Sequence, residues 1–228
     1  MTTPSLYRLL SALLDYPEPE LLEALPEIDR LLAATPDTHQ AHEKLTPLLD
    51  TLRSTDLITL QEHYVATFDR NPSHALHLFE HVHGDSRDRG PAMVDLCQTY
   101  EAAGLFLAPG ELPDHLTVVL QYASTQPPAQ AKAFLGEISH ILQVIFSALL
   151  RREAAHACVL AALLDLAGEK AQAVAVPPEP ELDESWAEPM AFDGCSTQGQ
   201  ARPGQPQPIQ IVRAPVRTAS HVMPGAST

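Results

Sequence analysis

The hydrophobic positions of residues 3–168 recur every three or four residues, which is the spacing of amphipathic helices. The first stripe of leucines begins after Thr3 and Pro4, a cap-plus-proline start, and stops at Pro17. Similar stripes follow, and most are separated by Pro or Gly. No alternating strand pattern competes with them. The pattern therefore predicts an all-α fold, a single helical bundle of eight or nine helices.

Three of these helices carry expectations that a structure can test. The sequence predicts one helix over residues 71–84, started by an Asn-Pro pair and stopped by a glycine. It predicts another that begins at Pro113 or Asp114, and a long apolar helix over residues 128–149.

The pattern changes near Val174, where proline, glycine and acidic residues replace the leucine stripes. We interpret residues 1–174 as the helical domain and residues 175–228 as a mostly disordered tail, because such a segment buries too little apolar area to offset its chain entropy. Trp186 and Phe192 are two candidate anchors within it. The tail could be an inert linker or a lid.

Charge narrows the classes of partner. The chain has 14 Lys and Arg against 29 Asp and Glu, a formal net charge of −15. This field repels phosphate backbones and anionic lipid, so we expect no nucleic-acid partner and no membrane insertion. It suits a partner that carries basic residues.

Cysteine usage and the N-terminus point to the cytoplasm. Cys97, Cys158 and Cys195 are odd in number and far apart, as a reducing compartment permits. The N-terminal segment lacks the features of a secretory signal, and the most apolar run, residues 141–150, is too short to cross a bilayer. We therefore expect a cytoplasmic protein.

Histidines gather in one part of the chain, with five of the eleven in residues 63–83. On the predicted helix, His74, His77 and His81 share one face. There is no H-E-x-x-H motif, and "PDHL" has Asp-His rather than the His-Asp order of helical metallo-phosphohydrolases. Solvated or hydrogen-bonded histidines are the preferred interpretation, and we predict no metal site.

The main alternative is nevertheless a helical His/Asp metal-dependent hydrolase that uses His81, His83, Asp85 and His115. Nucleophilic catalysis has less support, since no G-x-S-x-G and no Gly-rich phosphate loop is present. Cys97 lies on an apolar stripe, which is typical of an inert core thiol.

The segment "HGDSRDRG" has two interpretations, and its residues alone do not choose between them. It could be a helix–helix turn in which Asp85 or Ser86 caps the next helix and the arginines pair locally. It could also be the polar rim of an apolar cleft.

A longer pattern joins these segments. "YVATFDRNPSHALHLFEHVHGDSRDRGPAMVDLCQTYEAAGL", followed by "ELPDHL" and "LQYAS", resembles the nitrate reductase molybdenum-cofactor assembly chaperones, the NarJ-type delta subunits. These belong to a larger family that includes the trimethylamine-oxide and dimethyl-sulfoxide reductase chaperones. The similarity runs from "YRLLSALLDYP" to about Gly168 and returns in the tail at "LDESWAEPMAFDGC".

The resemblance implies an all-helical chaperone with no catalytic residues and no cofactor of its own. Its partner would be the N-terminal region of the apo catalytic (alpha) subunit of respiratory nitrate reductase. It would assist molybdenum cofactor insertion and enzyme assembly without becoming part of the finished enzyme. Thr117 stands where the family pattern often has Pro.

The family's marked segments, with one neighbouring hydrophobe, define the predicted client-peptide site. Its residues are Tyr64, Phe68, Phe79, Glu80, His81, Val82, His83, Asp85, Arg87, Asp88, Arg89, Glu111, Leu112, Pro113, Asp114, His115 and Leu116.

These residues predict an apolar groove with an acidic rim, into which an amphipathic client helix would lay its apolar face. The hydrophobes expected to line or buttress it are Phe79, Val82 and Leu112. The acids expected on its rim are Glu80, Asp85, Asp88, Glu111 and Asp114. His81, His83 and His115 would make recognition depend on pH. The alternatives are plain core packing for Phe79 and helix N-capping for Glu111 or Asp114.

Overall fold

A computed structural model describes residues 3–33, 36–70, 72–84 and 86–175 of the chain. These residues form ten α-helices: α1 Thr3–Leu13, α2 Pro19–Ala33, α3 Pro36–Ser54, α4 Leu57–Tyr64, α5 Leu78–His83, α6 Arg89–Ala102, α7 Leu116–Thr125, α8 Pro128–Glu137, α9 Ser139–Arg151 and α10 Ala157–Ala167. A π-helical turn, Val65–Asp69, and a 3-10 turn, Pro72–His74, lie between α4 and α5. The described residues contain no strand, so the all-α prediction is confirmed. The predicted tail lies outside them, apart from Ala175.

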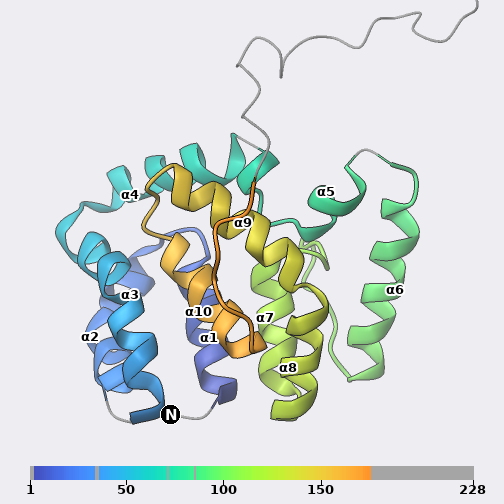
Figure 1. The fold of residues 1–228 in the computed structure, drawn as a ribbon, viewed down its shortest axis with the longest axis horizontal. Coiled ribbons are helices and arrows are strands. Elements are labelled where there is room, and N and C mark those ends of the chain that lie inside the picture. Colours follow the sequence, from blue (N-terminus) through green and yellow to red (C-terminus); the bar gives the residue numbers. More distant parts are fainter. Residues whose placement is uncertain (1–2, 34–35, 71, 85, 176–228) are drawn as a thin grey trace, which may run out of the picture. The chain divides into compact units, whose positions relative to one another are not determined.

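Leucine side chains form the core of the described part. Helix α1 packs along α7, while α10 lies against α3, α8 and α9, and α2 covers α3 (Figure 1). Leu10, Leu49, Leu120 and Leu142 are among the side chains that are completely buried. Each buried leucine contributes about 1.5–3 kcal/mol relative to an exposed one, so the leucine stripes are sufficient to hold these helices together.

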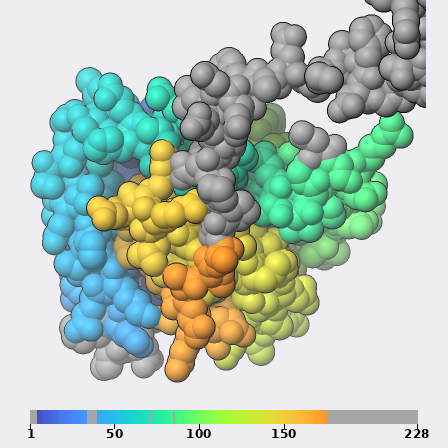
Figure 2. Space-filling view, turned by 45° about the horizontal axis from the view of Figure 1, so that its top comes forward, coloured from blue at the N-terminus to red at the C-terminus, as the bar shows by residue number. Residues whose placement is uncertain are grey.

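Helix α6 stands at the edge of the bundle, next to α5 (Figure 1). Of its residues only Tyr100 is buried, and Cys97 is half-buried. The apolar stripe predicted for this helix therefore buries fewer side chains than its spacing suggested. On the face seen in Figure 2, α9 in yellow and the residues after α10 in orange separate the α3 side from the α5–α6 side.

The predicted long helix over residues 128–149 is wrong, because the structure divides it into α8 and α9. The two helices meet at Ile138 with a bend of 65°. At the bend the Ser139 hydroxyl donates to the Gly136 carbonyl oxygen at 2.8 Å, a local bond that competes with the helical pattern. Glycine is also a weak helix former. No single helix in the described ranges is long and apolar enough to span a membrane, and only this bent pair reaches that length together.

The predicted helix over residues 71–84 is also wrong. The chain makes the 3-10 turn, extends at His77 and then forms α5, which has only six residues. His77 pairs with His115 in an isolated antiparallel bridge, supported by bonds from the Leu78 amide to Asp114 O at 3.0 Å and from the Leu116 amide to Leu76 O at 2.8 Å. The bridge satisfies backbone groups that a continuous helix would have paired internally.

Two further predictions that depend on residues 71–84 and on the segment paired with them are also wrong. His74 lies in the 3-10 turn, His77 caps α5 and His81 lies within it, so the three histidines do not share one helix face. Helix α7 begins at Leu116 rather than at Pro113 or Asp114, because the residue before it, His115, forms the antiparallel bridge with His77.

Candidate functional site

The predicted site residues of the first segment lie on α5 and the turn after it. Glu80, His81 and His83 are half-buried, and so is Phe79, whose ring contacts the His83 ring at 5.6 Å between centroids. The His81 Nε2 donates to the Ala75 carbonyl oxygen at 2.8 Å. This part of the site is therefore a short helix with its polar groups largely turned to local partners.

The turn that follows α5 is exposed. Val82 points to solvent, as do Arg87 and Asp88, whereas Asp85 lies outside the described residues. The Ser86 hydroxyl donates to the Asp88 carboxylate at 3.3 Å and accepts from the Asp88 amide at 3.2 Å. The segment "HGDSRDRG" is thus a helix–helix turn, but Ser86 bonds within that turn, and the N-cap position of α6 is Asp88 rather than Ser86.

Asp114 is completely buried, so its predicted place on an exposed rim is wrong. Its carboxylate accepts a bond from the Phe79 amide at 3.1 Å and lies 3.4 Å from His77 Nδ1. The Phe79 amide is one of the free N–H groups at the start of α5, which makes Asp114 a cap supplied from the α6–α7 loop. Capping was one alternative from the sequence, but the helix capped is α5 rather than α7.

Arg89, the first residue of α6, joins Asp114, His77 and Phe79 in one cluster of contacts. Its guanidinium lies 3.2 Å from the Glu80 carboxylate and 3.8 Å from that of Asp114. At the other end of α6 the Tyr100 hydroxyl donates to the Pro113 carbonyl oxygen at 2.8 Å. Both ends of α6 are therefore held by the adjacent residues Pro113 and Asp114.

The cluster shifts the pKa values of its members. Burial alone would raise the pKa of Asp114, but the bonds from His77 and the Phe79 amide outweigh it and lower that pKa below its ordinary value. The same bond to Asp114 raises the pKa of His77, against its own burial. Burial, helped by the charge of His77, lowers the pKa of His115. His77 is thus favoured in its charged form and His115 in its neutral form.

Three other predicted residues belong to the core. Tyr64, Phe68 and Leu116 are buried. The Tyr64 hydroxyl donates to the Leu14 carbonyl oxygen at 3.1 Å, and its ring lies 4.8 Å from that of Phe68 between centroids. Core packing explains these residues without a client.

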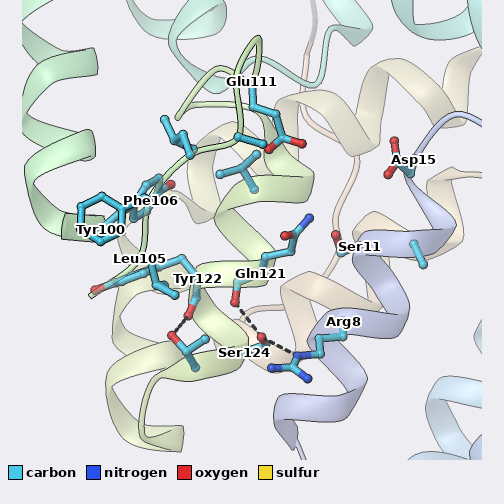
Figure 3. A pocket seen from close by; sticks show the side chains of 15 residues that line it. Arg8, Ser11, Asp15, Tyr100, Leu105, Phe106, Glu111, Gln121, Tyr122 and Ser124 are labelled. Carbon is cyan, nitrogen blue, oxygen red and sulfur yellow. Dashed lines mark hydrogen bonds between the residues drawn. The ribbon is translucent and has the colours of Figure 1, made fainter. Parts of the chain in front are cut away.

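A cavity of about 560 Å³ opens beside the "ELPDHL" segment, between α1, α7 and the loop that joins α6 to α7 (Figure 3). Its lining residues come from these three, from Asp15 just after α1 and from Tyr100 of α6: Arg8, Ser11, Ala12, Asp15, Tyr100, Leu105, Phe106, Leu107, Ala108, Glu111, Val118, Gln121, Tyr122, Ser124 and Thr125. Of the residues predicted for the site, only Glu111 lines this cavity, and Leu112 is an exposed neighbour.

The two ends of this cavity differ in charge. Figure 3 shows Asp15 and Glu111 toward one end and Arg8 at the other, where the Arg8 Nε donates to the Ser124 hydroxyl at 3.2 Å. Asp15, Glu111 and Arg8 are all exposed, and the bond to Ser124 holds Arg8 against α7. The end with the two acids is therefore the end suited to bind a cation.

Phe106 is the most unusual residue of the cavity wall. Its side chain is 81% exposed, next to half-buried Leu105 and Leu107. Covering a phenylalanine would contribute about 1.5–3 kcal/mol, so an aromatic held open beside a cavity favours a binding surface. Phe106 was not among the residues predicted for the site. The available signal was the run Leu105–Leu107 in a loop, outside any amphipathic stripe and just before Pro109-Gly110.

The histidines and acids do not gather as the hydrolase alternative requires. Within the described ranges, no group of three or more His, Cys, Asp and Glu side chains could hold a metal ion. His81 and His115 have different partners. The His81 Nε2 donates to the Ala75 carbonyl oxygen, and the His115 Nδ1 lies 2.6 Å from the Thr117 hydroxyl oxygen. The described helices instead form a scaffold with an open cavity, edged by acids and carrying an exposed phenylalanine, which is an arrangement typical of binding proteins.

Comparison with known proteins identifies the family. The family model for the nitrate reductase delta subunit matches residues 33–157. The nitrate reductase molybdenum cofactor assembly chaperone NarJ of Escherichia coli K12 is 40% identical over 161 residues, which cover 70% of this chain and 68% of NarJ. The NarW protein of the same strain, named a probable chaperone of the same kind, is 36% identical over 195 residues, 86% of this chain and 82% of NarW.

The chain belongs to the nitrate reductase delta subunit family, whose named relatives are assembly chaperones and not enzymes. The fold agrees with one solved structure, a candidate redox enzyme maturation protein from Archaeoglobus fulgidus, at a TM-score of 0.51 and 19% identity. The match covers 74% of this chain and 96% of that one.

Proposed function

We propose that this protein is a cytoplasmic chaperone for the assembly of respiratory nitrate reductase. It binds the N-terminal region of the apo catalytic alpha subunit, assists molybdenum cofactor insertion and leaves before the enzyme is complete. The observation that carries this proposal is the acid-edged cavity with exposed Phe106, in a chain of the delta subunit family.

The client segment enters the cavity as an amphipathic helix. Phe106 and Leu112 contact its apolar face, and Asp15 and Glu111 meet its basic residues. The predicted residues Asp114 and Arg89 act behind this surface, since they fix α5 and α6 around the loop that carries Phe106. Val82 and His83 at the end of α5, and Asp88 in the exposed turn after it, extend the contact.

Energetics favour reversible binding. Three or four apolar anchors contribute roughly 5–12 kcal/mol, at about 1.5–3 kcal/mol each. Association and ordering of the peptide oppose this by about 4–15 kcal/mol. The apolar term alone nearly cancels, so attraction between acidic protein and basic peptide decides the affinity. A maturation factor that must release its client needs this balance.

Titration calorimetry with a peptide of the alpha subunit's N-terminal region tests the site. Phe106→Ala is expected to weaken binding about tenfold, because it removes about 1.5 kcal/mol or more of apolar contact. Ile58→Ala is the matched control, since Ile58 is 69% exposed on α4, away from the cavity, and it should leave the affinity within about twofold.

Charge reversal tests the other half of the site. Glu111→Lys should weaken the peptide about tenfold, while Glu137→Lys, an equal charge change at an exposed residue of α8, should weaken it far less. Equal effects of both reversals would mean that only overall charge matters. Unchanged affinity for both Phe106→Ala and Glu111→Lys would overturn the cavity as the client site.

A further inference from the structure

A second hollow, of about 610 Å³, runs between α1 and α2. It borders the other side of α1, and Arg8, Ala12 and Asp15 line both this hollow and the cavity of Figure 3. We call it the α1–α2 groove. Its lining positions on α1 and on α2 are spaced by three and four residues, so each helix presents one continuous face to it.

The floor of the α1–α2 groove is apolar. Leu9 and Ile28 are nearly buried at its base, and Leu31 stands at its edge with a 40% exposed side chain. Ala12 and Ala24 lie between them, and their small side chains leave the space open. The groove follows about two turns of α1 and about three turns of α2, a length over which a helical segment can place two or three apolar side chains.

Four acids border this floor. Asp15, Glu18, Glu20 and Glu27 are exposed, and Glu27 pairs with Arg30 on the same helix. Arg8 is the one base among the lining residues of the groove, all of which are described, and its Nε donates to Ser124 on α7. The groove is therefore clearly negative around an apolar strip.

We propose that the α1–α2 groove docks a cationic amphipathic helix of a partner polypeptide, separately from the segment held in the cavity of Figure 3. The apolar strip takes the leucine-like face of such a helix, and the flanking carboxylates meet its Lys and Arg side chains. An anionic lipid surface is disfavoured because the same carboxylates and the net charge of −15 repel it.

This docking does not depend on the proposed client site. The two surfaces have different apolar contacts, Leu31 and Ile28 in the groove against Phe106 in the cavity. Each can therefore be removed without the other, and a result on one does not decide the other.

The test uses the full chain and a blocked peptide of about 18 residues made of Leu and Lys, with Leu at helical i, i+3, i+4 and i+7 positions. Amide shifts in a ¹⁵N-labelled sample should change on α1 and α2, above all at Leu9, Ala24 and Leu31. A shuffled peptide of the same composition should bind about tenfold more weakly, because it has no apolar face.

Two variants locate the binding. Leu31→Lys should weaken the Leu/Lys peptide about tenfold and leave the alpha-subunit peptide within about twofold. Leu150→Lys is the matched control, since Leu150 is 46% exposed on α9 and outside the groove. Ala24→Arg fills the centre of the groove and should weaken binding as well. Leu and Ala are both exposed here and Lys and Arg are good helix formers, so the fold is retained, which circular dichroism checks.

Four outcomes would overturn the proposal. One is equal binding of the shuffled peptide, which means attraction by charge alone. Another is a set of shift changes that avoids α1 and α2. The third is an affinity that Leu31→Lys and Leu150→Lys change alike. Adsorption of the chain to phosphatidylserine vesicles, lost in Leu31→Lys, would replace the peptide partner by a membrane and would also refute it.

Discussion

The buried carboxylate of Asp114 contacts two other segments of the chain: the start of α5, through the Phe79 amide and the His77 ring, and the start of α6, through the Arg89 guanidinium. Asp114→Ala leaves the Phe79 amide without its acceptor and removes the carboxylate that faces His77 and Arg89, although Arg89 keeps its pair with Glu80. We expect the free energy of unfolding to fall by about 3 kcal/mol, measured by urea denaturation near neutral pH. Glu111→Ala, an exposed acid of the same loop, should change it by less than about 0.5 kcal/mol. Similar small losses for both would mean that the cluster contributes no stability.

His156 should make stability depend on pH. Its ring lies 5.1 Å from the Phe68 ring and 6.4 Å from the Tyr64 ring between centroids, and burial lowers its pKa to about 4. Its neutral form is favoured by folding, so its contribution is fully present above the ordinary histidine pKa of about 6.5. That contribution is lost as the pH falls from there toward 4, because the unfolded chain binds a proton that the folded chain does not.

The corresponding measurement compares urea denaturation at about pH 7.5 and about pH 5. His156 alone accounts for a loss of about 2 kcal/mol between them. His156→Phe keeps a ring in the same place and removes the titration, so its loss should be smaller by that amount. His140→Phe, at an exposed histidine of α9, should lose as much as the unmodified protein. If the two variants behave alike, His156 does not titrate as its burial requires.

At this scale the sequence did not predict where the site residues lie. "ELPDHL" was predicted as part of the client-peptide site with Asp114 on its exposed rim, whereas Asp114 is buried. Its burial depends on the bridge between His77 and His115, which joins residues far apart in the chain and leaves no periodic signal. The same bridge moved His74 and His81 off their shared face. Phe106 was missed because an exposed hydrophobe in a loop looks like any other loop residue.

Among the helices, α5 is followed by Gly84, whose backbone conformation only glycine adopts without strain. Gly84 has φ +51° and ψ −129°, a conformation that is strained for any residue with a Cβ, although nothing lies within 4 Å of where a Cβ would be. Gly84→Ala should therefore reduce the free energy of unfolding by about 1–3 kcal/mol through backbone strain alone.

Gly136→Ala is the matched control for this prediction. Gly136 lies within α8 without a positive φ, and it too has open space around its Cβ direction. Alanine there should leave stability unchanged or raise it by up to about 1 kcal/mol. Chemical denaturation of both variants measures the difference, and opposite signs are expected. A loss of equal size at both positions would rule out strain at Gly84 as the cause.

Elements that rest on local patterns were predicted well. Helix α1 follows the first leucine stripe, and several of the later stripes also form helices. Helix α10 ends just before Gly168, whose left-handed φ of 89° fits a glycine stop. The break between α8 and α9 was not predicted, because the apolar stripe continues through Ile138. The bond from the Ser139 hydroxyl to Gly136, together with the low helix propensity of Gly136, produces this bend. Neither can be seen in the pattern of hydrophobic positions.

Over the whole molecule, acidic charge and open apolar surface occur together. The chain has 29 acids against 14 bases, and only six of those acids and three of those bases lie in residues 176–228. Both hollows that flank α1 are edged by carboxylates. Composition therefore predicts a basic partner. It did not locate the surfaces, since these depend on which helices pack beside α1.

This arrangement predicts how binding of the alpha-subunit peptide responds to salt. Raising NaCl from about 0.05 M to about 0.5 M shortens the Debye length from about 14 Å to about 4 Å, so steering of a basic peptide is largely lost. We expect the affinity to fall about tenfold, mainly through a slower association rate, measured by stopped-flow fluorescence. Phe106→Ala should instead speed dissociation by a similar factor at both salt concentrations, because its contact is apolar and unscreened.

A peptide with its Lys and Arg replaced by Gln separates these two contributions. It should bind more weakly and show little dependence on salt, while Phe106→Ala still weakens it further. The two changes act on different rate constants, so their effects on the free energy of binding should add to within about 0.5 kcal/mol. A strong salt dependence that persists with the neutral peptide would show that salt acts on the protein's own conformation, and the charge-steering account would then be wrong.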